Sequence, residues 1–211
     1  MNKTVIFDLD GTLCDTILDI VQSVNRTRED YNLPALPIDV VTAFTGDGAR
    51  KLLERSLEGT NVNIDEALPK MIQHYADHPA ENTKVYPQVL EGLKRLKEAG
   101  WKLAIVTNKP GNVARLITAA TKLDEYLDDC IGGNDGFALK PDPEAIHYLL
   151  KKYNSCTQNA WILGDNHTDI NSGVKAQISS AFATWGFGTL ENAPYTIKVN
   201  CFNEFVDYLL K

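Results

Sequence analysis

The chain has 211 residues, which suits one large domain with an insertion but is short for two large domains. Its 28 acidic residues outnumber its 21 basic residues, and the formal net charge is -7. This balance disfavours a nucleic acid or an anionic membrane as a partner, because both call for clustered Lys and Arg.

The first expected element is a buried strand over 4–7, where Thr-Val-Ile-Phe runs directly into acidic residues and Gly11. The next stretch, residues 16–79, shows apolar residues at helical spacing and no convincing strand. Pro34 and Pro37 interrupt it, and Gly46 and Gly48 indicate a turn that opens a helix. This stretch therefore predicts a group of helices.

From residue 85 onward, helices and strands are expected to alternate. Helices are predicted over 89–100, 112–120, 143–153, 169–176 and 202–210, and strands over 103–106, 130–131, 161–163 and 180–183. Such alternation is typical of a parallel sheet covered by helices on both faces. We therefore predict an α/β fold in which residues 1–15 and 82–211 form the core and residues 16–81 form an inserted helical cap.

Four polar clusters follow predicted strands, where ligands bind in open parallel sheets. They are Asp8-Leu9-Asp10-Gly11-Thr12, Thr107-Asn108-Lys109, Lys140-Pro141-Asp142-Pro143 and Gly164-Asp165-Asn166-His167-Thr168-Asp169. Although they are far apart in sequence, we expect them to converge in one cleft.

The acidic residues of these clusters predict a magnesium site. Asp8, Asp10, Asp165 and Asp169 would repel one another without a cation, and Mg²⁺ prefers oxygen ligands. We expect Asp8, Asp165 and the main-chain carbonyl of Asp10 to hold the ion, with Asp169 as a ligand or as an anchor for metal-bound water. Lys140 and Thr107 would then receive phosphate oxygens.

These residues together predict a phosphoryl-transfer site. Asp8 would attack phosphorus and form an aspartyl-phosphate, and Asp10 would act as the general acid and base. Strand alternation would aim both side chains to the same side. Gly11 would allow a sharp turn, and Thr12 would hydrogen-bond to Asp10 and hold it in place. Lys109 is close enough to the second motif to help with phosphate charge, but we expect it to be a solvated residue at a helix start.

The same motifs resemble those of the haloacid dehalogenase superfamily. Asp8-Leu9-Asp10-Gly11-Thr12-Leu13 is similar to its first motif, Val106-Thr107-Asn108 to its second, Lys140-Pro141 to its third, and Gly164-Asp165 with Asp169 to its fourth. The resemblance implies a Rossmann-like core, Mg²⁺, an aspartyl-phosphate and a cap that closes over substrate. It also implies that Asn108, Gly11 and Thr12 lie at the substrate.

Within that family the chain most resembles the phosphoglycolate phosphatase branch. Gly46-Asp47-Gly48-Ala49-Arg50 is similar to the cap loop of that branch, so Gly46 and Arg50 are expected to contact substrate, Arg50 through a carboxylate. Two departures stand out: Asp47 replaces an expected Asn, and Asn166-His167 replaces the usual Ser or Thr. Asp10 favours phosphatase over dehalogenase chemistry.

Several functions remain open from the sequence. The leading prediction is hydrolysis of a small phosphorylated metabolite, phosphoglycolate first. Sugar phosphates, nucleotides and pyrophosphate are alternatives on the same machinery, as is a phosphomutase. A non-catalytic binding module with a phospho-acceptor Asp is the alternative from another class, although Asp10 and the long cap disfavour it.

Cysteine usage bears on location. Cys14, Cys130, Cys156 and Cys201 are scattered, with no C-x-x-C pair, and the chain starts without a signal-peptide pattern. We therefore expect reduced thiols and a cytoplasmic protein whose partner is a small phosphorylated substrate. No pattern in the chain predicts an oligomeric state.

Overall fold

The computed structural model describes residues 2–211, and it confirms the α/β core. One sheet contains β1 (Asn2–Phe7), β4 (Lys102–Val106), β5 (Asp129–Ile131), β6 (Ser155–Gly164), β7 (Ser179–Ala183) and β8 (Ile197–Val199). The strand order is β5-β4-β1-β6-β7-β8, and each neighbouring pair is parallel. The short strand β8 was not predicted, and β6 is longer than the predicted 161–163.

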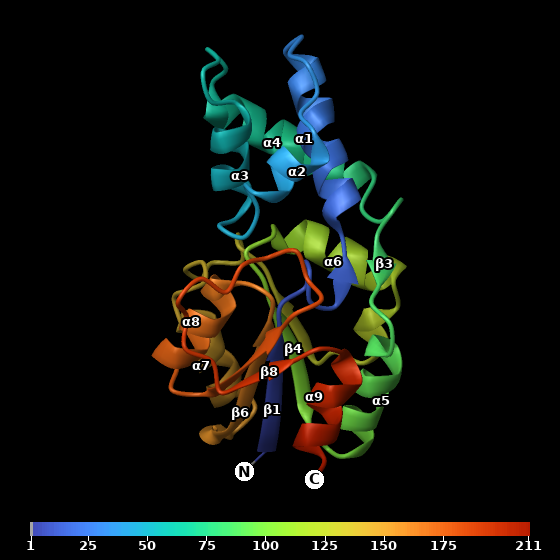
Figure 1. Ribbon diagram of the computed structural model, residues 1–211, viewed down its shortest axis with the longest axis vertical. Coiled ribbons are helices and arrows are strands. Elements are labelled where there is room, and N and C mark those ends of the chain that lie inside the picture. The colour runs from blue at the N-terminus through green and yellow to red at the C-terminus, as the bar shows by residue number, and fades with distance from the viewer. Residues whose placement is uncertain (1) are drawn as a thin grey trace.

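Helices cover both faces of the sheet (Figure 1). One face carries α5 (Val89–Glu98), α6 (Gly111–Ala120) and α9 (Phe202–Leu209), and the other carries α7 (Glu144–Lys152) and α8 (His167–Lys175). A 3-10 turn, η1 (Leu123–Glu125), follows α6. In the central strand, alternate side chains serve the two faces: Val5 and Phe7 pack into the α5/α9 layer, and Ile6 packs into the α7 layer. The rings of Phe7 and Phe202 lie 5.8 Å apart.

The strand order places a crevice beside the central strand. The chain runs outward from β1 to β4 and β5, and it then returns to the other side of β1 for β6, β7 and β8. In such sheets the order reverses at the carboxyl end of the first strand, where the loops diverge and leave room for a ligand. The loops after β1, β4 and β6 therefore meet at one place.

Four helices form a separate layer above this end of the sheet (Figure 1). We call residues 17–77 the helical region; it contains α1 (Ile17–Asp30), α2 (Ile38–Thr42), α3 (Ala49–Ser56) and α4 (Ile64–Asp77). The buried Arg28 ties the layer together, because its guanidinium donates to the carbonyls of Pro34 and Ser56. Asn63 caps α4 by accepting the N–H of Asp65. None of the helices described in residues 2–211 has the length and apolar character needed to cross a bilayer.

Two short strands connect the helical region to the core. The outgoing strand β2 (Cys14–Asp15) pairs antiparallel with the returning strand β3 (Lys84–Val85). The buried carboxylate of Asp19 fastens this junction, because it accepts hydrogen bonds from the backbone N–H and the side chain of both Asn82 and Thr83, at 2.6–3.1 Å. Neither two-residue strand was predicted.

Candidate active site

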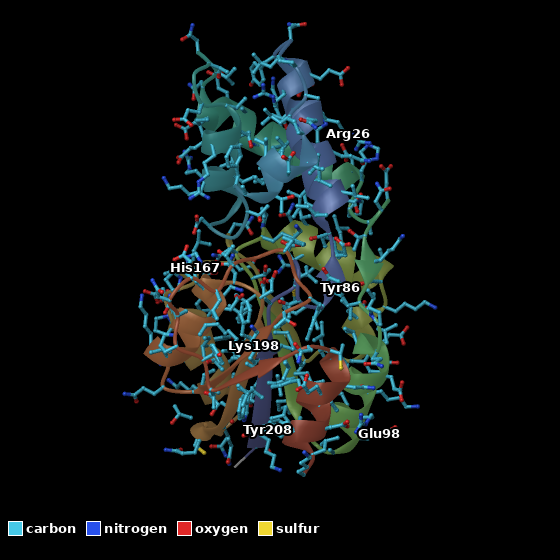
Figure 2. All side chains as sticks on the ribbon, in the orientation of Figure 1. Arg26, Tyr86, Glu98, His167, Lys198 and Tyr208 are labelled. Carbon is cyan, nitrogen blue, oxygen red and sulfur yellow. The ribbon has the colours of Figure 1, made fainter. Side chains whose placement is uncertain are left out.

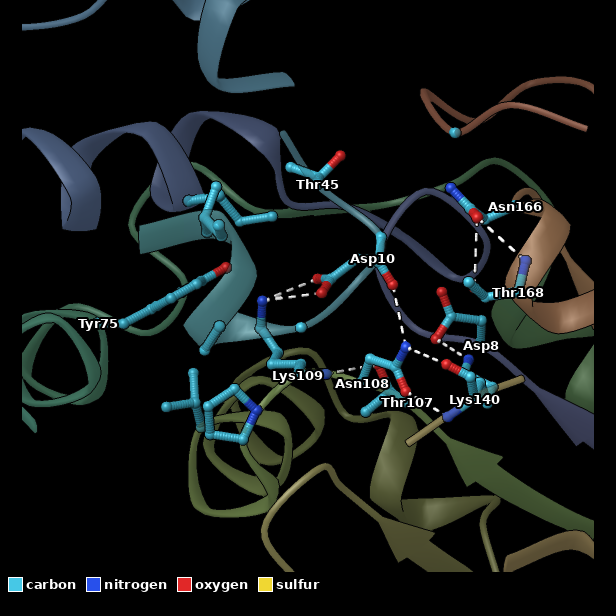
Figure 3. A pocket seen from close by; sticks show the side chains of 18 of the residues that line it. Asp8, Asp10, Thr45, Tyr75, Thr107, Asn108, Lys109, Lys140, Asn166 and Thr168 are labelled. Atoms are coloured by element: carbon cyan, nitrogen blue, oxygen red, sulfur yellow. Dashed lines mark hydrogen bonds and ion pairs between the residues drawn. The ribbon is translucent and has the colours of Figure 1, made fainter. Parts of the chain in front are cut away.

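The four polar clusters meet at the carboxyl end of the sheet. Asp8 follows β1, Thr107 follows β4, Asp165 follows β6, and Lys140 lies in the loop after β5. Because β1 lies between β4 and β6, these loops are neighbours in space (Figure 3). The convergence expected from the sequence is therefore a property of the strand order.

Three buried carboxylates form the centre of the site. Asp8, Asp165 and Asp169 each offer an oxygen, and these oxygens lie within 4.8 Å of one another. Burial raises the pKa of Asp8 to about 6, and burial together with Asp169 and Asp8 raises the pKa of Asp165 well above its ordinary value. Crowded, desolvated carboxylates favour a bound cation, and an all-oxygen donor set suits a hard divalent ion. The residues therefore fit a metal site.

Lys140 supplies the positive charge nearest to this cluster. Its Nζ lies 2.7 Å from Asp8 Oδ1 and 2.6 Å from Asp169 Oδ1, and the side chain is 2% exposed. Burial alone would lower the pKa of Lys140, but Asp169 and Asp8 outweigh burial and raise it. A single ammonium offsets only part of the negative charge of three carboxylates, so the remaining charge favours the binding of a second cation.

Asp169 is held by its own helix as well. Its Oδ2 accepts the backbone N–H of Asn166, while the Asn166 side chain accepts the N–H of Thr168. This is a capping box at the start of α8. It gives Asn166, which departs from the expected Ser or Thr, a defined role: the residue caps the helix that carries Asp169.

Glycines let the chain approach Asp165 closely. Gly11 has φ +76°, and a Cβ there would lie 2.0 Å from Asp165 Oδ2. A Cβ at Gly186 would lie 2.2 Å from the same atom, and Gly188 donates its N–H to it at 2.8 Å. The sequence analysis missed Gly186 and Gly188, because they lie in the loop between β7 and β8, far along the chain from any acidic motif.

The surroundings of Asp10 differ from the prediction. Thr16, rather than Thr12, donates its hydroxyl to Asp10 Oδ1 at 2.6 Å. Thr12 instead donates to Asp165 Oδ1 at 3.3 Å, because the turn at Gly11 directs Thr12 toward β6. Lys109 was expected to be solvated, but its side chain is 3% exposed and its Nζ lies 2.9 Å from both oxygens of Asp10.

Thr107 and Asn108 follow β4 and are both buried. Both polar atoms of the Asn108 side chain make hydrogen bonds within the protein: its Oδ1 accepts the N–H of Lys140 at 2.8 Å, and its Nδ2 donates to the carbonyls of Lys140 and Gly46 at 2.9 and 3.0 Å. Asn108 therefore joins the Lys140 loop to the loop before α3. Thr107 lines the cavity beside Asp8 and Lys140 (Figure 3).

The cavity lies between the helical region and the sheet. It encloses about 80 Å³ and includes Asp8, Asp10, Thr107, Lys140 and Asp165 in its lining, together with Gly46 of the helical region. That volume exceeds the roughly 10–15 Å³ needed for one water several-fold, which suits a small molecule.

Two residues that the sequence analysis named, Arg50 and His167, do not line this cavity. Arg50 points to solvent, with its side chain 51% exposed and paired with Asp65 at 2.6 Å. His167 is the first residue of α8 and lies at the edge of the core (Figure 2), with its Nδ1 3.5 Å from Glu191.

Comparison with known proteins gives consistent matches over most of the chain. Residues 5–183 match the haloacid dehalogenase-like hydrolase family. A phosphoglycolate phosphatase from Colwellia psychrerythraea is 33% identical over 216 residues, covering 99% of this chain and 96% of that protein. One from Aquifex aeolicus is 33% identical, covering 90% and 88%. The crystal structure of a predicted phosphoglycolate phosphatase from Haemophilus somnus 129pt superposes with a TM-score of 0.92 at 26% identity, covering 98% and 97%.

Proposed function

The chain belongs to the haloacid dehalogenase-like hydrolase family and is a phosphoric monoester hydrolase, and we propose that it hydrolyses a small phosphorylated metabolite through an aspartyl-phosphate on Asp8. The observation that carries the proposal is the convergence of Asp8, the cavity and Lys140: a nucleophile at the cavity wall lies beside a fixed cation. Phosphoglycolate is the proposed substrate, by analogy with the named relatives.

We propose Mg²⁺ as the cofactor. The ligands would be the carboxylates of Asp8 and Asp165 and the main-chain carbonyl of Asp10, and Asp169 would bind the ion directly or through water. The oxygen cluster of Asp8, Asp165 and Asp169 supports this assignment. When bound, the ion would neutralise charge on the phosphoryl oxygens. The buried Lys140 pairs with Asp8 and Asp169 and contributes a fixed positive charge.

In the first step, a carboxylate oxygen of Asp8 attacks phosphorus, and the bond between phosphorus and the ester oxygen breaks. Asp10 acts as the general acid and passes a proton to the leaving oxygen. Thr16 and Lys109 fix the orientation of Asp10 for this transfer. In the second step, Asp10 takes a proton from water as that water attacks the phosphoryl group, which releases phosphate and restores Asp8.

The helical region closes the cavity from above, and we propose that residues 16–81 act as a cap. The hydrogen bond from Asn108 to the carbonyl of Gly46 and the cavity lining on both sides support this role. Closure excludes water from the phosphoryl group until the leaving group has departed. The four free cysteines fit the cytoplasmic location that we also propose.

Hydrolysis of p-nitrophenyl phosphate and 2-phosphoglycolate with Mg²⁺ tests this function. We expect turnover that EDTA abolishes and Mg²⁺ restores, and a loss of at least about 1,000-fold in kcat for Asp8→Asn. Asp15→Asn, an exposed acidic position on β2, serves as the matched control and should retain activity. Full activity in Asp8→Asn would refute the covalent mechanism, and no turnover of any phosphate by the wild type would favour a binding module.

A further inference from the structure

The leaving-group side of the cavity is largely apolar. The side chains that form this wall come mainly from the helical region and α6: Ile20, Leu52, Met71, Ile72, Tyr75 and Val113. An anionic group placed against such a wall is unfavourable unless a cation meets it. The proposed substrate, on which this inference rests, carries a carboxylate on its leaving group.

Only two cationic side chains line the cavity within the described chain, Lys109 and Lys140. Lys140 is enclosed between Asp8 and Asp169, at 2.7 and 2.6 Å, so its charge serves the phosphoryl end. Arg50, the residue that the sequence suggested for a carboxylate, faces solvent and pairs with Asp65. Lys109 is therefore the one cation placed for the leaving group.

Lys109 is held in position by two contacts. Its Nζ lies 2.9 Å from Asp10 and 4.1 Å from the centre of the Tyr75 ring, which comes from α4 (Figure 3). An ammonium over an aromatic face is attracted by the ring, and the ring also shields it from water. Among residues 2–211 the buried Tyr75 hydroxyl has no hydrogen-bond partner, which leaves a second donor near this side of the cavity.

We propose that Lys109 determines specificity by binding a carboxylate on the leaving group of the substrate. Asp10 must come within hydrogen-bond reach of the leaving oxygen, about 2.6–3.2 Å, in order to protonate it. Lys109 touches Asp10, and the carboxylate carbon of a glycolate group is only two bonds from that oxygen. An ammonium has three N–H donors, so Lys109 can hold Asp10 and a substrate carboxylate at the same time.

Paired substrates separate this role from a purely structural one. Isobutyl phosphate has the shape of 2-phosphoglycolate but an uncharged leaving group, with methyl groups in place of the carboxylate oxygens. With Mg²⁺, we expect the wild type to show at least a tenfold higher kcat/KM for 2-phosphoglycolate. Lys109→Met should remove most of this preference, mainly through a higher KM for 2-phosphoglycolate, and Lys109→Arg should keep part of it. Lys51→Met, an exposed cation of α3, is the matched control and should leave the ratio unchanged.

Three results would overturn the inference. The first is a wild type without the tenfold preference, which requires no variant. The second is an equal fall for both substrates in Lys109→Met, because a residue that only positions Asp10 would affect both alike. The third is loss of the preference in Arg50→Met instead. Each leaves the proposed phosphatase function standing as long as p-nitrophenyl phosphate is hydrolysed, whereas absence of all turnover would refute the function and this inference together.

Discussion

Asp19 is expected to be a major determinant of stability, because it joins the two connections of the helical region. Its carboxylate is 2% exposed and accepts hydrogen bonds from the backbone N–H of Asn82 and of Thr83, as well as from their side chains. Asp19→Ala removes the acceptor of all these groups. The backbone donors cannot turn away, whereas the side chains can reach water.

The size of the effect follows from the two backbone donors. A hydrogen bond to a charged group contributes about 1.5–3 kcal/mol, so the two together contribute about 3–6 kcal/mol. Residues 82 and 83 are half-buried, and water can replace part of this loss, so we expect a decrease of about 3 kcal/mol in the free energy of unfolding. For a chain of this length that corresponds to a fall of about 6–12 °C in Tm.

Urea unfolding followed by circular dichroism measures this change. Asp19→Asn keeps the shape but turns an N–H group toward the donors, and it should lose a comparable amount. Asp77→Ala is the matched control: that carboxylate accepts one bond, from Gln73, on an exposed surface, and its loss should stay within about 0.5 kcal/mol. A decrease below about 1 kcal/mol for Asp19→Ala would show that the reasoning is wrong.

Three further predictions concern the site and the thiols. Gly11→Ala should reduce kcat at least about 100-fold, because a Cβ at φ +76° would lie 2.0 Å from Asp165 Oδ2. Steady-state kinetics measures this loss, and Gly59→Ala is the control because a Cβ there meets nothing within 4 Å. Asp165→Asn should raise the Tm of the metal-free protein by about 2–4 °C, since burial raises the pKa of that carboxyl and disfavours its charged form. The same variant should be stabilised less by added Mg²⁺. A lower Tm of the metal-free variant would contradict this prediction. Ellman's reagent at pH 8 should modify the exposed Cys201 rapidly but leave Cys14 and Cys130 unmodified until unfolding, because burial raises the pKa of each of these two thiols to about 12. Rapid reaction of Cys14 or Cys130 in the native protein would contradict this prediction.

The core and the acidic cluster were predictable because their signals are local. Short apolar runs that end in Asp8, Thr107 or Asp165 identify strand ends, and parallel pairing then brings those ends together. The family match and the superposition over nearly the whole chain confirm the fold drawn from these patterns.

Contacts between different loops were not predictable in the same way. Whether Thr12 or Thr16 reaches Asp10 depends on the direction of one turn, and no spacing rule distinguishes the two. The burial of Lys109 depends on α4 lying across it, which requires the placement of the whole helical region. The strands β2 and β3 are too short for any periodicity and exist only through their pairing.

That pairing also makes the core independent of the length of the inserted segment. Because Cys14 and Val85 are neighbours, the chain leaves and re-enters the core at nearly one point. Helices between these positions can lengthen, shorten or be exchanged without shifting the register of β1 against β4 and β6. Changes in the inserted helices can therefore reshape the apolar wall of the cavity without moving the reacting residues that follow β1, β4 and β6.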